Sequence, residues 1–245
     1  MTGVSAPLVE LFASFQGEGM YVGMPQVFVR LAGCDLDCIY CDTRYAREIP
    51  ETWHIEAGDE QEALANPATV SDVVSVVTSR WKTISSVSIT GGEPLLHPDF
   101  VNALAWRLRS CNFDVHLETA GLHPDALEAV ADAVDVVAAD IKLPSTLSQP
   151  PSIPDMRRFW AIAGKLNTFA KIVVTDTVAP AELTATCAEI GPEIASVPAV
   201  IQPCTPVGGC IPPAFDRLWA LAQAADEWFS SVRVIPQCHR ILGAK

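Results

Sequence analysis

The chain has few basic residues, no long apolar run and no secretion signal at its start. Its 245 residues include 16 Lys and Arg against 29 Asp and Glu, for a net charge of −13. This balance argues against a general surface for nucleic acid or an anionic membrane, because both attract an excess of basic side chains. No apolar stretch reaches the roughly 20 residues of a membrane span, and no charged-then-apolar leader opens the chain. We therefore expect a protein of the reducing cytoplasm that binds neither nucleic acid nor membrane.

A fourth cysteine is missing from a motif that otherwise carries the ligands of an iron–sulfur cluster. Cys34, Cys38 and Cys41 have the spacing C-x3-C-x2-C, and no further cysteine follows at a spacing that would complete a four-thiolate site. Three thiolates on a four-iron cluster leave one iron free to bind a molecule from solution, whereas an electron carrier normally uses four cysteines. The motif therefore predicts a [4Fe-4S] cluster that takes part in chemistry.

Other roles for these cysteines remain open on spacing alone. A zinc ion could take a distant fourth ligand such as His54 or Cys111. Only Cys38 and Cys41, however, have the C-x2-C spacing that is usual for structural zinc. Unligated structural cysteines are disfavoured, because the surrounding loop is polar and free thiols normally lie in apolar cores.

Apolar runs typical of β-strands alternate with amphipathic helical patterns along most of the chain. In the clearest helical segment, 71–81, Val73, Val77 and Trp81 share one face and Ser71 is a candidate N-cap. Strand and helix in alternation predict a parallel sheet with helical crossovers. We predict strands at 26–31, 87–90, 115–119, 134–141, 170–175, 199–202 and 232–235, and helices at 71–81, 98–110, 124–131, 155–166, 180–190 and 213–228.

Most of the unusual residues follow the predicted ends of strands, at the edge where α/β sheets and barrels bind ligands. Six or seven strands are too few for an eight-stranded barrel. We expect an α/β fold with a partial barrel, open on one side, in a single domain over residues 1–245. The stretch 47–68 has little periodicity and contains Gly58, Pro67 and six acidic residues. It is expected to be an insertion on the surface.

Longer motifs support a specific resemblance. They are FASFQGEG at 12–19, GMPQVFVRLAGC at 23–34, CDT at 41–43, TGGEP at 90–94, ETAG at 118–121, DIK at 140–142 and PQCHR at 236–240. The cysteine spacing resembles that of the radical S-adenosylmethionine (SAM) enzymes. The ordered set of motifs is similar, over nearly the whole chain, to the 7-carboxy-7-deazaguanine synthase family. The resemblance implies a partial (β/α) barrel of the radical SAM type.

The resemblance also implies a reaction. Enzymes of this family convert 6-carboxy-5,6,7,8-tetrahydropterin to 7-carboxy-7-deazaguanine with loss of ammonia, on the route to deazapurine nucleosides such as queuosine. SAM binds the free iron and yields a radical that takes hydrogen from the pterin, while Mg²⁺ binds the substrate carboxylate. The implied partners are an electron donor, such as flavodoxin or ferredoxin, and a second copy of the chain in a homodimer.

The site residues that follow from the resemblance fall into four groups, with no separate catalytic side chain. The cluster is assigned to Cys34, Cys38 and Cys41, and Mg²⁺ to Thr43. Substrate contacts are assigned to Phe15, Gln16, Gly17, Arg30 and Thr90, and SAM contacts to Gly92, Glu118, Lys142, Ser145 and Gln202.

Several of these residues have simpler explanations. Arg30 lies in an apolar strand where a charge needs a partner, and either a substrate carboxylate or an internal salt bridge would supply one. Thr43 could cap its own loop, and Lys142 could pair with Asp140.

Two other classes of function also stay open. A radical SAM enzyme that activates a glycyl-radical protein would share the cysteines and TGGEP, but it has no need of QGEG together with Arg30. A non-catalytic iron–sulfur or zinc-binding module would need no SAM pocket.

Overall fold

Seven parallel strands form the middle of the computed structural model, which describes residues 3–58 and 60–245. They are β3 (Pro25–Leu31), β7 (Ser86–Gly91), β8 (Asp114–Thr119), β9 (Val136–Asp140), β10 (Thr168–Val174), β11 (Pro198–Pro203) and β12 (Ser231–Val234). Across the sheet they lie in the order β12-β11-β10-β9-β8-β7-β3. The seven correspond to the seven predicted strands, so the predicted parallel sheet is confirmed.

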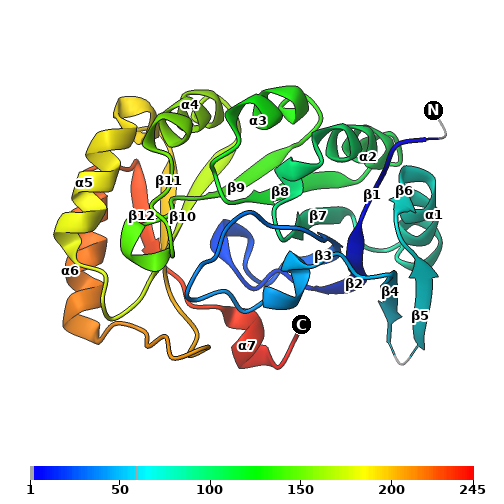
Figure 1. The fold of residues 1–245 in the computed structure, drawn as a ribbon, viewed down its shortest axis with the longest axis horizontal. Coiled ribbons are helices and arrows are strands. Elements are labelled where there is room, and N and C mark those ends of the chain that lie inside the picture. The colour runs from blue at the N-terminus through cyan, green and yellow to red at the C-terminus, as the bar shows by residue number, and fades with distance from the viewer. Residues whose placement is uncertain (1–2, 59) are drawn as a thin grey trace.

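Helices connect these strands and pack side by side around the outer face of the curved sheet (Figure 1). They are α1 (Val70–Arg80), α2 (Pro98–Ser110), α3 (Pro124–Val130), α4 (Ile153–Ala163), α5 (Pro180–Ile190) and α6 (Phe215–Asp226). The predicted N-cap of the first helix was wrong: Thr69, not Ser71, caps α1, because it forms a capping box with Asp72. Among the described residues, no helix combines the length and apolar character needed to cross a membrane.

The segment 47–68 differs from its prediction, because most of it is a β-hairpin that extends the sheet. β2 (Leu8–Phe15) pairs antiparallel with β3, and β4 (Thr52–Ala57) pairs in parallel with β2. β5 (Glu60–Ala65) then pairs antiparallel with β4 and ends the ten-stranded sheet. Trp53 and Ile55 are buried in the main core, while His54 between them is exposed. The hairpin was not predicted because the alternation of apolar and polar residues on β4 is short. In addition, β5 is rich in Glu, Gln and Ala, which are uncommon in strands.

Smaller elements complete the chain. β1 (Ser5–Ala6) and β6 (Ala68–Thr69) form a two-stranded sheet, and α7 (Cys238–Leu242) lies near the C-terminus. Short 3-10 turns occur at Gly19–Tyr21, Arg44–Arg47, Pro94–Leu96, Pro144–Thr146 and Pro192–Ile194. Since β12 and β5 are the two ends of the large sheet, the barrel is open, and α7 lies on the open side beside the first strands (Figure 1).

The two faces of the parallel strands differ in polarity. On β3, β7 and β8, alternate residues such as Val29, Ile89 and Leu117 belong to the main hydrophobic core beneath the helices. The residues next to them face the inside of the open barrel, and many are polar. They include Gln26, Arg30, Ser86, Ser88, Thr90, His116 and Glu118. The strands therefore use one face for packing and the other to build a site.

Trp53→Ala should lower the free energy of unfolding by about 3–5 kcal/mol, as expected when a buried aromatic side chain leaves a cavity. The matched control is His54→Ala, which removes the exposed neighbour on the same strand and should change the stability by less than about 0.5 kcal/mol. Urea unfolding of the three proteins measures the difference. Equal effects of the two substitutions would show that the hairpin does not contribute to the core.

Candidate active site

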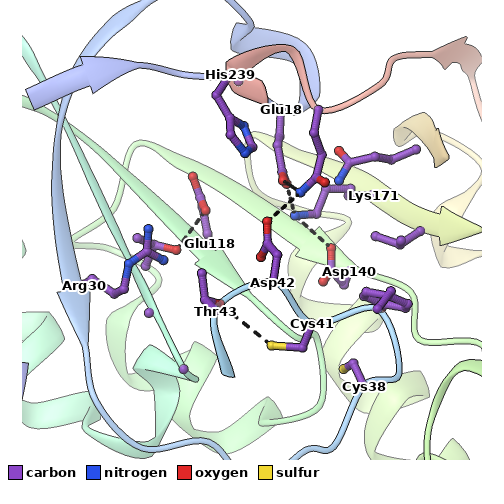
Figure 2. A pocket seen from close by; sticks show the side chains of 18 of the residues that line it. Glu18, Arg30, Cys38, Cys41, Asp42, Thr43, Glu118, Asp140, Lys171 and His239 are labelled. Carbon is purple, nitrogen blue, oxygen red and sulfur yellow. Dashed lines mark hydrogen bonds and ion pairs between the residues drawn. The ribbon is translucent and has the colours of Figure 1, made fainter. Parts of the chain in front are cut away.

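A cavity of about 400 Å³ opens on the inner face of the barrel, at the carboxyl ends of the parallel strands. It is lined by every predicted site residue except Ser145. Figure 2 shows that side chains from distant parts of the chain, among them Arg30, Cys41, Glu118 and Lys171, point towards one space. Ser145 is exposed, and its backbone N–H and hydroxyl donate hydrogen bonds to Glu182 at 2.7 and 2.8 Å. The structure therefore does not bring Ser145 to the cavity.

The three cysteines lie on the loop between β3 and the turn Arg44–Arg47, and all three are free thiols. Backbone hydrogen bonds hold this loop: Ile39 N–H donates to Thr146 O at 3.0 Å, and Cys41 N–H to Cys38 O at 3.1 Å. Burial raises the pKa of the Cys34 thiol to about 11. Burial also raises the pKa of Cys38, although nearby Lys142 opposes the shift. Such thiols stay protonated in the apo chain and become thiolates only as a metal displaces their protons.

The donor set fits an iron–sulfur cluster. Cys34, Cys38 and Cys41 line the same cavity. Within residues 3–58 and 60–245, no three side chains of His, Cys, Asp or Glu converge closely enough to share one metal ion. In a four-iron cluster each thiolate binds its own iron. The three free thiols on this one loop would each bind one iron of such a cluster.

Two glycines of the TGGEP motif let the cysteine loop pack against the end of β7. A Cβ atom on Gly92 would lie 2.0 Å from Gly33 O, and one on Gly91 would lie 2.3 Å from Leu31 O. Gly92 N–H donates to Leu31 O at 3.0 Å, which fixes the approach. Gly92 also lines the cavity. The absent side chains are thus required by backbone packing next to the cluster loop.

Glu93 joins the ends of β7 and β8. It is fully buried and accepts hydrogen bonds from Leu95 N–H (2.8 Å), Thr119 Oγ1 (2.8 Å) and Ala120 N–H (2.6 Å). Burial raises the pKa of this carboxyl group, an effect that these donors partly oppose. Glu93 therefore supports the cavity wall from behind.

Glu118 forms hydrogen bonds with two residues expected to contact substrate, Gln16 and Thr90, although the resemblance assigned Glu118 to SAM. Its carboxylate accepts hydrogen bonds from three side chains: Gln16 Nε2 at 2.8 Å, Ser88 Oγ at 2.8 Å and Thr90 Oγ1 at 2.9 Å. These contacts connect the QGEG segment with β7 and β8.

Arg30 has an internal partner and a free end. Its Nε donates to Glu10 Oε1 at 2.7 Å, so the internal salt bridge that the sequence left open is present. Tyr45 also donates to Glu10, at 3.0 Å, and Lys245 Nζ pairs with the same carboxylate. Arg30 lines the cavity, and its Nη1 and Nη2 have no hydrogen-bond partner among the described residues. One edge of the guanidinium is therefore held and the other is available to an anion.

A second group of charges joins β9, β10 and the QGEG segment. Lys142 Nζ lies 2.5 Å from Asp140 Oδ2, which confirms the ion pair that the sequence left open for Lys142. Lys171 Nζ lies 2.5 Å from Glu18 Oε2 and 3.5 Å from Asp140 Oδ1. Burial alone would raise the pKa of Glu18, but Lys171 and hydrogen bonds, including one from Gln237, lower it to about 2. Lys171 interrupts a predicted apolar strand as Arg30 does, and this signal could have found it.

The C-terminal segment closes over the site, which the sequence analysis did not predict. Gln237 Nε2 lies 2.7 Å from Glu18 Oε1 and 3.1 Å from Asp42 Oδ2, and Arg240 Nη2 lies 2.9 Å from the same Asp42 atom. A Cβ atom on Gly17 would lie 2.2 Å from His239 Nδ1. The PQCHR motif thus packs on the QGEG segment and beside the last cluster cysteine. The resemblance pointed to this motif, and so did its position directly after the predicted strand at 232–235.

The cavity concentrates basic residues in an acidic protein. Six of the 16 Lys and Arg residues line it, against four of the 29 Asp and Glu residues. The basic residues are Arg30, Arg47, Lys142, Lys171, Arg240 and Lys245. Such a cavity attracts ligands that carry carboxylates.

Comparisons with known proteins agree with this geometry. The model of the radical SAM superfamily matches residues 29–157. The 7-carboxy-7-deazaguanine synthase of Geobacter sulfurreducens is 36% identical over 250 residues, which cover 99% of each chain. The chain belongs to this family. The enzyme of the same name from Methanothermobacter thermautotrophicus is 36% identical over 263 residues, 98% of each chain. The crystal structure of QueE from Escherichia coli shares the fold, with a TM-score of 0.63 and 22% identity over 97% of this chain and 96% of that one.

Membership in the family decides between the alternatives that the sequence left open. A [4Fe-4S] cluster and SAM are the cofactors of the radical SAM superfamily. A member of this family is an enzyme, so the zinc-binding module and the non-catalytic iron–sulfur module are both set aside. The near full-length relatives are synthases, so the glycyl-radical activating function is also displaced. The partial barrel agrees with the fold expected from the resemblance.

Glu18→Gln should remove a pH-dependent part of the stability. The pKa of Glu18 is about 2 in the folded chain, against an ordinary value of 4.5. Its contribution is therefore present above pH 4.5 and is lost as the pH falls towards 2. We expect the variant to lose on the order of 2–3 kcal/mol at neutral pH and to show a flatter stability curve in this range.

Urea unfolding of the reduced, cluster-free chain between pH 2 and pH 7 tests this expectation. The matched control is Glu128→Gln, because Glu128 is exposed on α3 and lies outside the cavity. Parallel curves for the wild type and Glu18→Gln would contradict the assignment.

Proposed function

We propose that the chain converts 6-carboxy-5,6,7,8-tetrahydropterin to 7-carboxy-7-deazaguanine with release of ammonia, in the biosynthesis of 7-deazapurines such as queuosine. The observation that carries this proposal is the 36% identity to a 7-carboxy-7-deazaguanine synthase over 99% of the chain. One cavity that holds three free thiols and a half-paired arginine supports it. Cys34, Cys38 and Cys41 would hold the cluster, and the cluster with SAM supplies the one-electron chemistry that removes hydrogen from the pterin.

The residues of the chain bind and orient the substrate in this proposal. The free edge of Arg30 binds the pterin carboxylate, while Glu10 holds the other edge of the guanidinium in place. Phe15, Gln16, Gly17 and Thr90 line the same cavity as Arg30, and in this proposal they contact the ring. The C-terminal segment covers this part of the site and limits the access of water.

SAM contacts remain proposals of the same kind. Gly92, Lys142 and Gln202 line the cavity and stay candidates. Lys142 is already paired with Asp140, so it would act on SAM through its charge. Ser145 has no such support, because it lies outside the cavity.

Mg²⁺ is a further proposal, supported by the position of Thr43. Its Oγ1 lies 3.8 Å from Cys41 Sγ and Thr43 lines the cavity. Mg²⁺ keeps several waters and takes other ligands from a substrate, so one hydroxyl and the pterin carboxylate suit it. The homodimer, an electron donor such as flavodoxin or ferredoxin, and a reducing cytoplasm also stay predictions. The free state of all eight cysteines in the described chain accords with the last of these.

Anaerobic reconstitution tests the reaction directly. The iron-loaded chain with reductant, SAM and 6-carboxy-5,6,7,8-tetrahydropterin should yield 7-carboxy-7-deazaguanine and ammonia, measured by mass spectrometry and an ammonia assay. Cys38→Ala should lose the cluster absorbance and turnover. Cys111→Ala is the matched control, because Cys111 is exposed and outside the cavity, and it should retain both. Cleavage of SAM without the deazapurine would overturn the substrate assignment.

Arg30→Ala should raise the KM for the pterin by about 10- to 100-fold, the loss expected for hydrogen bonds to a charged group. The dissociation constant of SAM should stay within about twofold, because the lost contact is to the substrate carboxylate. Steady-state kinetics and SAM titration give the two values. Arg107→Ala, at an exposed position of α2, is the control and should change neither. Equal losses for pterin and SAM would mean that Arg30 has only a structural role.

A further inference from the structure

A chain of four polar side chains runs behind the cavity, from β8 through the QGEG segment and β3 and back to β8. Glu118 Oε1 accepts from Gln16 Nε2 at 2.8 Å, and Gln16 Nε2 also lies 2.9 Å from Gln26 Oε1. Gln26 Nε2 lies 2.9 Å from His116 Nδ1 and 2.9 Å from Ser86 Oγ. Gln16, Gln26 and His116 are all buried. Gln26, Ser86 and His116 have no role in the function proposed above.

Two contacts identify which end of the Gln16 amide is the NH₂ group and which is the oxygen. The Glu118 carboxylate can only accept a hydrogen bond, so the amide atom that faces it must be the NH₂ group. The backbone N–H of Glu18 can only donate, and it lies 3.0 Å from the other amide atom, which must therefore be the oxygen. In the reversed amide the oxygen of Gln16 would face the Glu118 carboxylate, and its NH₂ group would face the Glu18 N–H.

From this orientation the donors and acceptors of Gln26 and His116 can be deduced. Since Gln16 donates to Gln26, Gln26 must turn its oxygen towards Gln16 and its NH₂ group towards His116 and Ser86. His116 Nδ1 must then accept, so the imidazole is neutral and carries its proton on Nε2. A proton on Nδ1 would place two donors 2.9 Å apart.

The surroundings of His116 agree with a neutral ring. The ring of Tyr21 packs edge-on against it at 4.5 Å. Burial lowers the pKa of His116, although the carboxylates of Glu118, Asp114 and Asp135 oppose the shift. Gln26 is the side chain that meets Nδ1.

The hydrogen bonds within the protein limit which hydrogen bonds Gln16 can still form with a ligand. Both hydrogens of its NH₂ group are used, by Gln26 and Glu118, and one lone pair of Oε1 is used by Glu18 N–H. Gln16 lines the cavity, so its remaining capacity there is one lone pair of a carbonyl oxygen. We propose that His116 and Gln26 are positioning residues, which hold Gln16 so that it offers the pterin a hydrogen-bond acceptor and thereby selects a ring edge that carries N–H donors. The identity of the ligand as a pterin rests on the proposed function.

Substitutions at His116 separate positioning from simple packing. In His116→Asn the amide oxygen can take the place of Nδ1 as acceptor, whereas His116→Leu removes the acceptor. We expect the Leu variant to raise the KM for the pterin about tenfold. Gln16 is then no longer held in place, and its one hydrogen bond to the pterin is lost. SAM binding should be unchanged, and the Asn variant should remain close to the wild type.

Discrimination between ligands gives a second readout. The proposal places the Gln16 acceptor against the edge that carries the 2-amino group. The wild type should therefore bind 6-carboxy-5,6,7,8-tetrahydropterin better than its 2-oxo analogue, which lacks the 2-amino donor, and the Leu variant should lose most of this preference. Similar losses in the Asn and Leu variants, or a parallel loss of SAM binding, would overturn the proposal.

The tautomer of His116 can be measured without any turnover. Nitrogen-15 NMR of the oxygen-free holoenzyme at pH 7, with the signal assigned by its disappearance in His116→Asn, should show a neutral ring protonated on Nε2. A proton on Nδ1, or an imidazolium, would overturn the positioning role of His116 even if the enzyme makes the deazapurine. An enzyme that has the expected tautomer but makes no deazapurine would instead refute the proposed function.

Discussion

The pairing of Lys171 with Glu18 and Asp140 is the interaction on which the cavity depends. Lys171 stands on β10 inside the barrel, and its two carboxylate partners come from β9 and from the QGEG segment near the start of the chain. A charge buried there without partners would be strongly destabilising. Glu18 in turn accepts a hydrogen bond from Gln237, so the same pair anchors the C-terminal segment over the site. Distant parts of the chain are thus held around one cavity by charges that cannot be left unpaired.

The inner face of the sheet explains how an acidic protein can bind acidic ligands. The net charge of −13 repels anions in general, yet the cavity is lined by six Lys and Arg residues against four Asp and Glu residues. Since parallel strands alternate their side chains, the outer positions can be apolar under the helices while the inner positions carry charge. One set of strands therefore supplies both the core and the site.

Local sequence patterns predicted most of the fold, but they did not predict the hairpin at the edge of the sheet. The parallel strands and the crossover helices were predicted because each has a clear period of 2 or 3.6 residues and turn residues at its ends. The hairpin of β4 and β5 was missed, since its stability comes from Trp53 and Ile55 packing on a core built elsewhere. The partners of Arg30 and Lys142 were named only as alternatives, because a sequence shows that a buried charge needs a partner without showing which one.

The sequence by itself determined the family and predicted the cluster ligands, since Cys34, Cys38 and Cys41 are near neighbours whose spacing has chemical meaning without a fold. Only the tertiary structure decided which groups face one another in the cavity. Gln16 meets Glu118 across 102 positions of the chain, and Glu18 meets Gln237 across 219. It also left Ser145 outside and assigned an orientation to the Gln16 amide. Contacts of this range follow from the way the sheet brings strand ends together, and no local period of hydrophobicity encodes them.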